Sequence, residues 1–226
     1  MSRIIISALL AISIYSVNAQ CIEVEYCTHS KVMKDDDKTM ERAGMSPEMI
    51  KMMIGASRKD AEVCRLHLLR YQDGKSSYLF KRFISYSPVD FSYNSLDTYK
   101  QHNQARIYQH HPSMPDGKSK QRNMMTMDDW IVHDDIIRDI SGYKCIRATN
   151  EKHHVAWFTM DIPIAEGPSI YSGLPGLIVE YDTGKHMITA MSISLPDCDQ
   201  FEAISVTASD KVLTSEEMIN LRKGGR

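Results

Sequence analysis

The sequence predicts a mainly β fold, a curved antiparallel sheet accompanied by two short helices. Three observations lead to this class. Several short segments alternate apolar and polar residues with a period of two, which is typical of a half-exposed strand. Turn-forming residues such as Asp73-Gly74 separate neighbouring segments at the spacing of a hairpin. The alternation of strands with helices that marks a parallel sheet is missing.

The first residues have the pattern of a cleaved signal peptide. Arg3 precedes a short apolar run over 4–14, and the predicted cut lies between Ala19 and Gln20. The run is shorter than the roughly 20 apolar residues that a membrane span requires. No later segment reaches that length, so we expect no transmembrane helix. Residues 20–226 are therefore expected to form a single exported domain, periplasmic or associated with the outer membrane.

The composition limits the partners and indicates the redox environment. The net charge is −2 and both signs are interspersed, which argues against the basic stripe of a nucleic-acid-binding protein. In an oxidising compartment some of the five cysteines should form disulfides, but their spacing does not select a pairing. Because Cys21 follows the apolar run closely, lipid attachment there stays open, although Gln20 is larger than the residue that usually precedes a lipidated cysteine. The cysteines are Cys21, Cys27, Cys64, Cys145 and Cys198.

The strands follow from alternation and from the turns between them. In 64–70 the even positions are apolar until Arg70, and Asp73-Gly74 then leads into a partner strand at 78–80. The triplet 182–184 links two later strands as a tight hairpin. The remaining strands are predicted at 22–26, 143–149, 154–160, 177–181, 187–193 and 204–207.

Capping signals predict the two helices. Ser46 followed by Pro47 is an N-cap with a first-turn proline, and the methionine-rich face that follows is expected to pack on the core. Thr214 and Glu217 form a capping box near the end of the chain.

The stretch 93–127 is polar and has no clean period, so we expect a long exposed excursion. It contains closely spaced histidines and methionines, among them His110, His111 and Met114. Imidazole and thioether groups are ligands that suit copper. The sequence therefore raises the hypothesis of a copper-binding loop in this excursion.

The hexapeptide Gly173–Ile178 reads Gly-Leu-Pro-Gly-Leu-Ile and carries no ionisable or nucleophilic side chain. Its role must therefore be one of shape. Pro175-Gly176 fits the central positions of a type II turn, which would require a positive φ at Gly176. Leu177 and Ile178 then begin an apolar run that is typical of a strand buried on both faces.

The motifs around the hexapeptide follow one another with a recognisable spacing. They are 143–149, 156–159, Ile162-Pro163, Gly167-Pro168 and Gly173–Ile178. In these motifs the chain resembles the GLPGLI family, exported proteins of the Bacteroidota, most clearly over 130–193. The resemblance implies an extracytoplasmic β-rich domain, often from genomes rich in TonB-dependent transporters, and implies no catalytic residues. The expected fold is also similar to that of lipoprotein-carrier proteins.

These observations favour a non-enzymatic binding module of the cell envelope. We expect it to hold a hydrophobic, lipid-like ligand in the concave sheet or to dock with an outer-membrane partner, such as a TonB-dependent transport component. The residues expected to shape that region, as ligand contacts or as structure, are Trp157, Phe158, Leu174, Pro175, Gly176, Leu177 and Ile178.

Two alternatives remain at this point, the copper-binding loop and an envelope hydrolase. The hydrolase rests on scattered groups: His133 beside Asp134, and the carboxylates of Asp161 and Glu166. We interpret Asp161 and Glu166 as a solvated pair that forms turns. The nucleophile motif Gly-x-Ser-x-Gly and a glycine-rich phosphate loop are both missing from the sequence.

Overall fold

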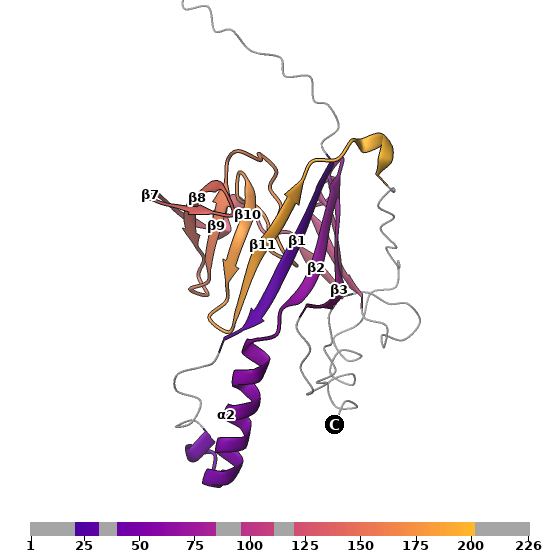
Figure 1. Cartoon of the computed structure of the whole chain (residues 1–226). Coiled ribbons are helices and arrows are strands. Elements are labelled where there is room, and N and C mark those ends of the chain that lie inside the picture. The colour runs from indigo at the N-terminus through magenta and orange to yellow at the C-terminus, as the bar shows by residue number, and fades with distance from the viewer. Residues whose placement is uncertain (1–20, 32–39, 85–95, 111–119, 202–226) are drawn as a thin grey trace, which may run out of the picture.

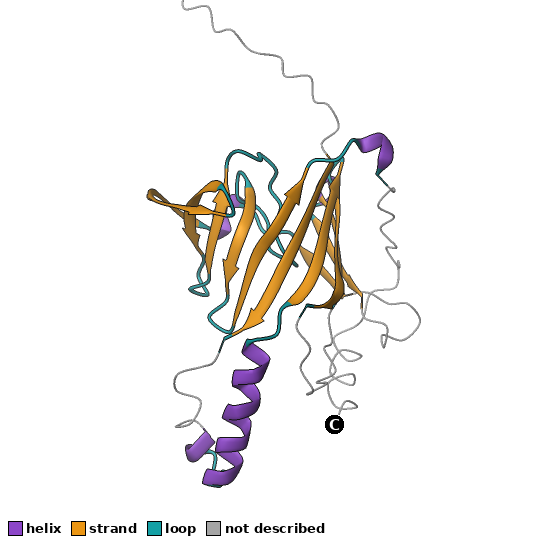
Figure 2. Cartoon of the chain, in the orientation of Figure 1, coloured by secondary structure: helices purple, strands orange, loops and turns teal. Residues whose placement is uncertain are grey.

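The computed structural model describes residues 21–31, 40–84, 96–110 and 120–201. Within these ranges eleven strands form one antiparallel sheet that curves strongly, as Figures 1 and 2 show. The predicted class is confirmed. The strands are β1 (Cys21–Ser30), β2 (Arg65–Gln72), β3 (Lys75–Phe83), β4 (Asp97–Gln101), β5 (Arg106–His110), β6 (Lys120–Asn123), β7 (Ile131–Ile140), β8 (Tyr143–Thr149), β9 (Val155–Thr159), β10 (Leu177–Asp182) and β11 (His186–Ser194).

The strand order across the sheet is β6-β5-β4-β3-β2-β1-β11-β10-β9-β8-β7. Each half is a meander in which consecutive strands are neighbours, and the two halves meet where β1 pairs with β11. The strands β6 and β7 therefore lie at opposite edges of the sheet. The connection 124–130 leads from one edge to the other, through the 3₁₀ turn η3 (Met127–Asp129).

The strands predicted in the described residues are present, with no end shifted by more than four residues. Asp73 and Gly74 both have positive φ, 48° and 73°, which is the geometry of the tight hairpin expected between β2 and β3. Gly184, with φ 79°, turns the chain between β10 and β11. The predicted strand at 204–207, the C-terminal helix and the signal peptide lie outside the described residues.

The helix α2 (Pro47–Ala61) begins where the capping signal predicts. The hydroxyl of Ser46 accepts a hydrogen bond from the amide of Met49 at 3.3 Å. The expected packing of its methionine face is wrong, because Met52 is 69% exposed and Ile50 alone is buried. The other short helical turns are η1 (His102–Gln104) and η4 (Cys198–Gln200). Among the described residues, none of the helices has the length and apolar character needed to cross a membrane.

The expectation of a long exposed excursion over 93–127 is wrong for the described part of that stretch. It contains β4, β5 and β6, which extend the sheet beyond β3. The side chains of Thr98, Lys100 and Gln109 are buried although they are polar. An interior that contains polar groups hides the apolar period by which strands are found in a sequence.

Two disulfides are formed, Cys21–Cys198 and Cys27–Cys64. The Cys21 sulfur is bonded to another sulfur and so cannot carry a thioether-linked lipid at the same time. Cys145 on β8 is a buried free thiol, and burial raises its pKa to about 11.

Candidate functional site

The segment 160–178, which contains the hexapeptide, is hydrogen-bonded to both halves of the sheet. From β1, the hydroxyl of Tyr26 donates to the carbonyl of Ile178 at 2.5 Å. From the other half, the indole nitrogen of Trp130 donates to the carbonyl of Ser172 at 3.0 Å. These two bonds therefore fix the segment between β1 and the residue that precedes β7.

A buried charge cluster fixes this segment to β3 and β4. Lys100 and Glu166 are both fully buried, and the ammonium lies 2.6 Å from Glu166 Oε2. The hydroxyl of Ser76 donates to Glu166 Oε1 at 2.8 Å, and His102 Nε2 also contacts that oxygen. Lys100 donates in addition to two backbone carbonyls, those of Gly167 and Tyr171, at 2.8 and 3.1 Å.

The charges of this cluster keep Glu166 ionised. Burial alone would raise the pKa of Glu166, but the charge of Lys100, together with the hydrogen bond and charge of His102, outweighs burial and lowers that pKa to about 2. Burial lowers the pKa of Lys100, against the opposing effect of Glu166. A carboxylate held this firmly in the charged form is poorly suited to general acid–base catalysis near neutral pH. The cluster therefore holds the segment in place against β3 and β4.

The predicted pairing of Asp161 with Glu166 as solvated carboxylates is therefore wrong. Asp161 is exposed, whereas Glu166 is buried and has its partners on distant strands. Sequence reasoning missed Lys100, because its position in an apparently loop-like stretch gave no sign of burial. His133 of the hydrolase alternative contacts the hydroxyl of Thr149 at 2.9 Å, and Asp134 is exposed.

The hydrophobic residues of the motif form part of the core. Leu174, Leu177 and Ile178 are fully buried and Phe158 is 1% exposed, whereas Pro175 is exposed. Trp157 is half-buried, and the Arg138 guanidinium lies 4.3 Å from its ring centre.

The glycines of the motif are required for close approach. The expected positive φ at Gly176 is wrong, since the positive φ of the hexapeptide belongs to Gly173, at 91°. A Cβ on Gly176 would lie 2.0 Å from the carbonyl oxygen of Thr159, and one on Gly173 would lie 2.5 Å from that of Met125. The hexapeptide is thus clamped between two backbone segments.

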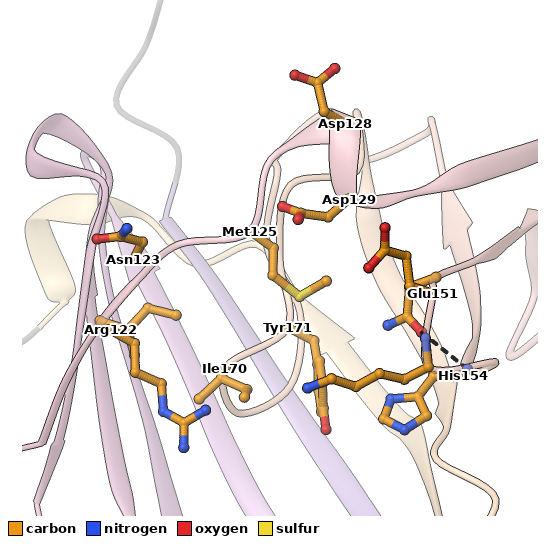
Figure 3. A pocket seen from close by; sticks show the side chains of 12 residues that line it. Arg122, Asn123, Met125, Asp128, Asp129, Glu151, His154, Ile170 and Tyr171 are labelled. Carbon is orange, nitrogen blue, oxygen red and sulfur yellow. Dashed lines mark hydrogen bonds between the residues drawn. The ribbon is translucent and has the colours of Figure 1, made fainter.

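A pocket of about 300 Å³ lies beside this clamp, between the two ends of the sheet (Figure 3). Figure 3 shows Arg122 and Ile170 on one side, Glu151 and His154 on the other, and Met125 and Tyr171 between them. Its remaining lining residues are Ile107, Asn123, Asp128, Asp129, Asn150 and Lys152.

The neutral wall of this pocket is held by hydrogen bonds. Tyr171 and Tyr181 stack with ring centres 3.7 Å apart, and the Tyr181 hydroxyl lies 2.7 Å from His154 Nδ1. Burial raises the pKa of Tyr181 and lowers that of His154, so an uncharged phenol faces an uncharged imidazole. The Asn150 side-chain oxygen accepts from the amide of His154 at 3.1 Å. The wall is therefore preformed.

Arg122 lines this pocket and, in the described part of the chain, carries a donor without a partner. Its Nε atom is buried and has no hydrogen-bond partner among the described residues. A buried donor without an acceptor costs about 1–3 kcal/mol. A ligand that brings an acceptor to this nitrogen would recover that cost. Sequence reasoning missed Arg122, because a single arginine in a polar stretch carries no signal.

A second pocket, of about 250 Å³, lies on the other side of Tyr171. The ring of His67 stacks on Tyr78 there, with centres 4.8 Å apart, and burial lowers the pKa of His67 to about 4. Among the described residues, none of the predicted copper ligands lines this second pocket. His110 is half-buried at the end of β5, and His111 and Met114 lie outside the described residues.

A family model described as "Protein of unknown function (Porph_ging)" matches residues 95–180. The chain is similar to that uncharacterised family over this span. The match includes the hexapeptide, the charge cluster's Lys100 and Glu166, and the pocket residues Arg122 and Tyr171, and it is consistent with the GLPGLI resemblance. No curated protein matches the chain.

A solved structure described as "Structure of PNGF-II in C2 space group" shares the fold. The TM-score is 0.54 at 12% sequence identity, over 91% of this chain and 32% of that chain. Identity this low shows the fold alone. The present chain spans about a third of the length of the PNGF-II chain that it matches.

Proposed function

We propose that the chain is an exported, non-enzymatic binding module of the cell envelope, periplasmic or outer-membrane-associated. The pocket between β6 and the β8–β9 turn holds an anionic group that belongs to a small ligand or to the chain end of an envelope partner. The observation that carries this proposal is Arg122, which lines a preformed pocket and whose Nε has no hydrogen-bond partner among the described residues. Such pockets, mostly preformed and with a few placed polar groups, are typical of ligand sites.

The lining supports a ligand that is both charged and partly apolar. Arg122 and Lys152 are the cations of the pocket. Of its carboxylates, Asp129 accepts from the amide of Thr126 at 2.7 Å, and Asp128 and Glu151 are exposed to solvent. Ile170 and Met125 provide apolar surface beside them. A carboxylate attached to a short aliphatic group matches this arrangement, since guanidinium groups bind carboxylates through charge-assisted hydrogen bonds.

The titratable groups of the wall support a partly apolar ligand. Burial raises the pKa of Tyr181 and lowers that of His154, so both meet a ligand as uncharged hydrogen-bonding groups. The pocket volume of about 300 Å³ supports a small ligand over a lipid chain. The likeness to a third of the PNGF-II chain supports a module, because the same fold occurs there as part of a longer protein.

The proposal is tested by calorimetric titration of the mature protein with N-acetyl-leucine and with its uncharged amide. We expect the carboxylate to bind at millimolar concentration and the amide to bind more weakly. Arg122→Gln should weaken carboxylate binding about tenfold, as loss of a charge-assisted hydrogen bond implies. Arg82→Gln, an exposed position on β3, is the matched control and should bind as the wild type does. Equal binding of both probes, no binding of either, or an unaffected Arg122→Gln variant would refute the proposal.

Native mass spectrometry of protein purified from its own envelope separates the other occupants. A retained lipid-sized mass would indicate a hydrophobic ligand in place of the small anion. Stoichiometric copper would move the function to the 93–127 stretch. Co-purification of an outer-membrane transport component would identify the partner whose chain end binds in the pocket.

A further inference from the structure

The disulfide Cys27–Cys64 has an imidazole within hydrogen-bond distance. The His29 Nε2 atom lies 3.1 Å from the Cys27 sulfur. The two sulfurs and a ring nitrogen of His29 all lie within 4.8 Å of one another. Two sulfurs and an imidazole nitrogen are a frequent ligand set for zinc.

Strand geometry explains why these groups converge. Cys27 and His29 are two residues apart on β1, so their side chains point to the same face of the sheet. Cys64 directly precedes β2, which pairs with β1. Across the other neighbour, His29 is the register partner of Met187 on β11. The ligand atoms therefore come from β1 and from the residue that precedes β2, its neighbour in the sheet.

Burial around the three groups is unequal, which suits an ion that must enter. Cys27 is 1% exposed and Cys64 is 7% exposed, whereas His29 is half-buried. The sulfurs are thus shielded from water and the imidazole faces the accessible side. A thiolate pair in such a place would be costly unless a cation balanced its charge.

We propose that Cys27, His29 and Cys64 form a redox-controlled zinc site. A dithiol reductant opens the Cys27–Cys64 bond and is itself oxidised to a disulfide, with two electrons and two protons passing to the cysteines. Zn²⁺ then displaces the two thiol protons and is bound by two thiolates and the neutral His29 imidazole. Water completes the tetrahedron, as in zinc sites with three protein ligands.

The change from disulfide to metal site requires little movement. Two sulfurs that share a tetrahedral zinc ion lie roughly 3.8 Å apart, given zinc–sulfur bonds of about 2.3 Å. That separation is within the 4.8 Å that already contains the three ligand atoms. The free thiol of Cys145 does not compete, because it is buried on β8 in the other half of the sheet.

Cobalt(II) reports the site directly, because thiolate coordination gives an intense charge-transfer absorption. The full mature chain is reduced with a phosphine, freed of reductant under argon and titrated with Co²⁺, then with Zn²⁺. We expect one equivalent of Co²⁺ to bind with a thiolate band and Zn²⁺ to displace it. The oxidised protein should show no band.

Matched variants locate the ligands, and circular dichroism checks that each is folded. Cys27→Ser should abolish the thiolate band, whereas Cys21→Ser, which removes the other disulfide, should keep it. His29→Ala should weaken Co²⁺ binding at least tenfold, and His153→Ala, at an exposed turn position, should not. Absence of the band in the reduced wild type, or its persistence in Cys27→Ser, would overturn the proposal. Unchanged affinity in His29→Ala would do the same.

Discussion

The buried pair of Lys100 and Glu166 offers a test in which the expected magnitude is large. Replacing Lys100 by Met removes the ammonium and leaves a fully buried carboxylate without its main counter-charge. Breaking such a pair typically costs about 3–5 kcal/mol of unfolding free energy. The lowered pKa of Glu166 leads to a similar figure. A fall from 4.5 to about 2 corresponds to about 3 kcal/mol at neutral pH.

The sign of the pH dependence follows from the direction of that shift. The folded-state pKa lies below the unfolded value, so the stabilisation is fully present above about pH 5 and is lost as the pH falls toward 2. In Lys100→Met the folded-state pKa should rise, and this part of the acid dependence should shrink or reverse.

Denaturant unfolding followed by the fluorescence of the buried Trp130 measures both effects, at pH 7 and at pH 4. The matched control is Lys31→Met. Its ion pair with Asp182 is partly exposed, with side chains 35% and 25% accessible, and should contribute less than about 1 kcal/mol. The reasoning fails if Lys100→Met loses no more than this control does. Glu166→Gln removes the carboxylate of the pair instead of the ammonium. It should also destabilise the fold, because Lys100 is then buried without its counter-charge.

Two further predictions concern a glycine and a histidine. Gly176→Ala should destabilise by more than about 2 kcal/mol, since the new Cβ would lie 2.0 Å from the carbonyl oxygen of Thr159. Gly55→Ala in α2, where a Cβ meets nothing within 4 Å, should stabilise by up to about 1 kcal/mol; melting temperatures that move in the same direction would contradict the clamp. The imidazole protons of His67 should titrate in NMR with a midpoint near 4. Since that folded-state pKa is lowered, stability should fall as the pH drops from about 6.5 to 4, and a midpoint above 6 would show that the ring is not buried as described.

The sequence was informative where the interior is apolar. The alternation in 64–70 located β2, and Asp73-Gly74 located the turn into β3, because each signal is local. The strands β4 to β6 were missed for the opposite reason. Their inner face presents Thr98 and Lys100, and a polar interior position looks like a loop when its partner is unknown.

The site residues were less accessible to prediction, because their roles depend on long-range contacts. Glu166 becomes a buried carboxylate only through Lys100, 66 residues earlier in the chain. Gly176 was expected to matter for its backbone angle, but it matters for its distance to a neighbouring strand. The position was identified correctly, and the physical reason for it required the fold.

The pairing of β1 with β11 determines how the order of the strands along the chain relates to their order in the sheet. If the order of the sheet is followed from β7 through β11 to β1 and on to β6, every strand is followed by its neighbour. The fold is thus a circular permutation of one uninterrupted up-and-down meander. The Cys21–Cys198 bond joins residues 177 positions apart at this junction.

In a permuted chain that began at β7 and ended at β6, every strand would pair only with the strands that precede and follow it along the chain. Its contacts would be closer in sequence, and folding rates rise as contacts become more local. In the natural order the pairing of β1 with β11 joins the two ends of the sheet-forming chain. The Cys21–Cys198 bond makes this junction covalent, since Cys21 begins β1 and Cys198 follows β11.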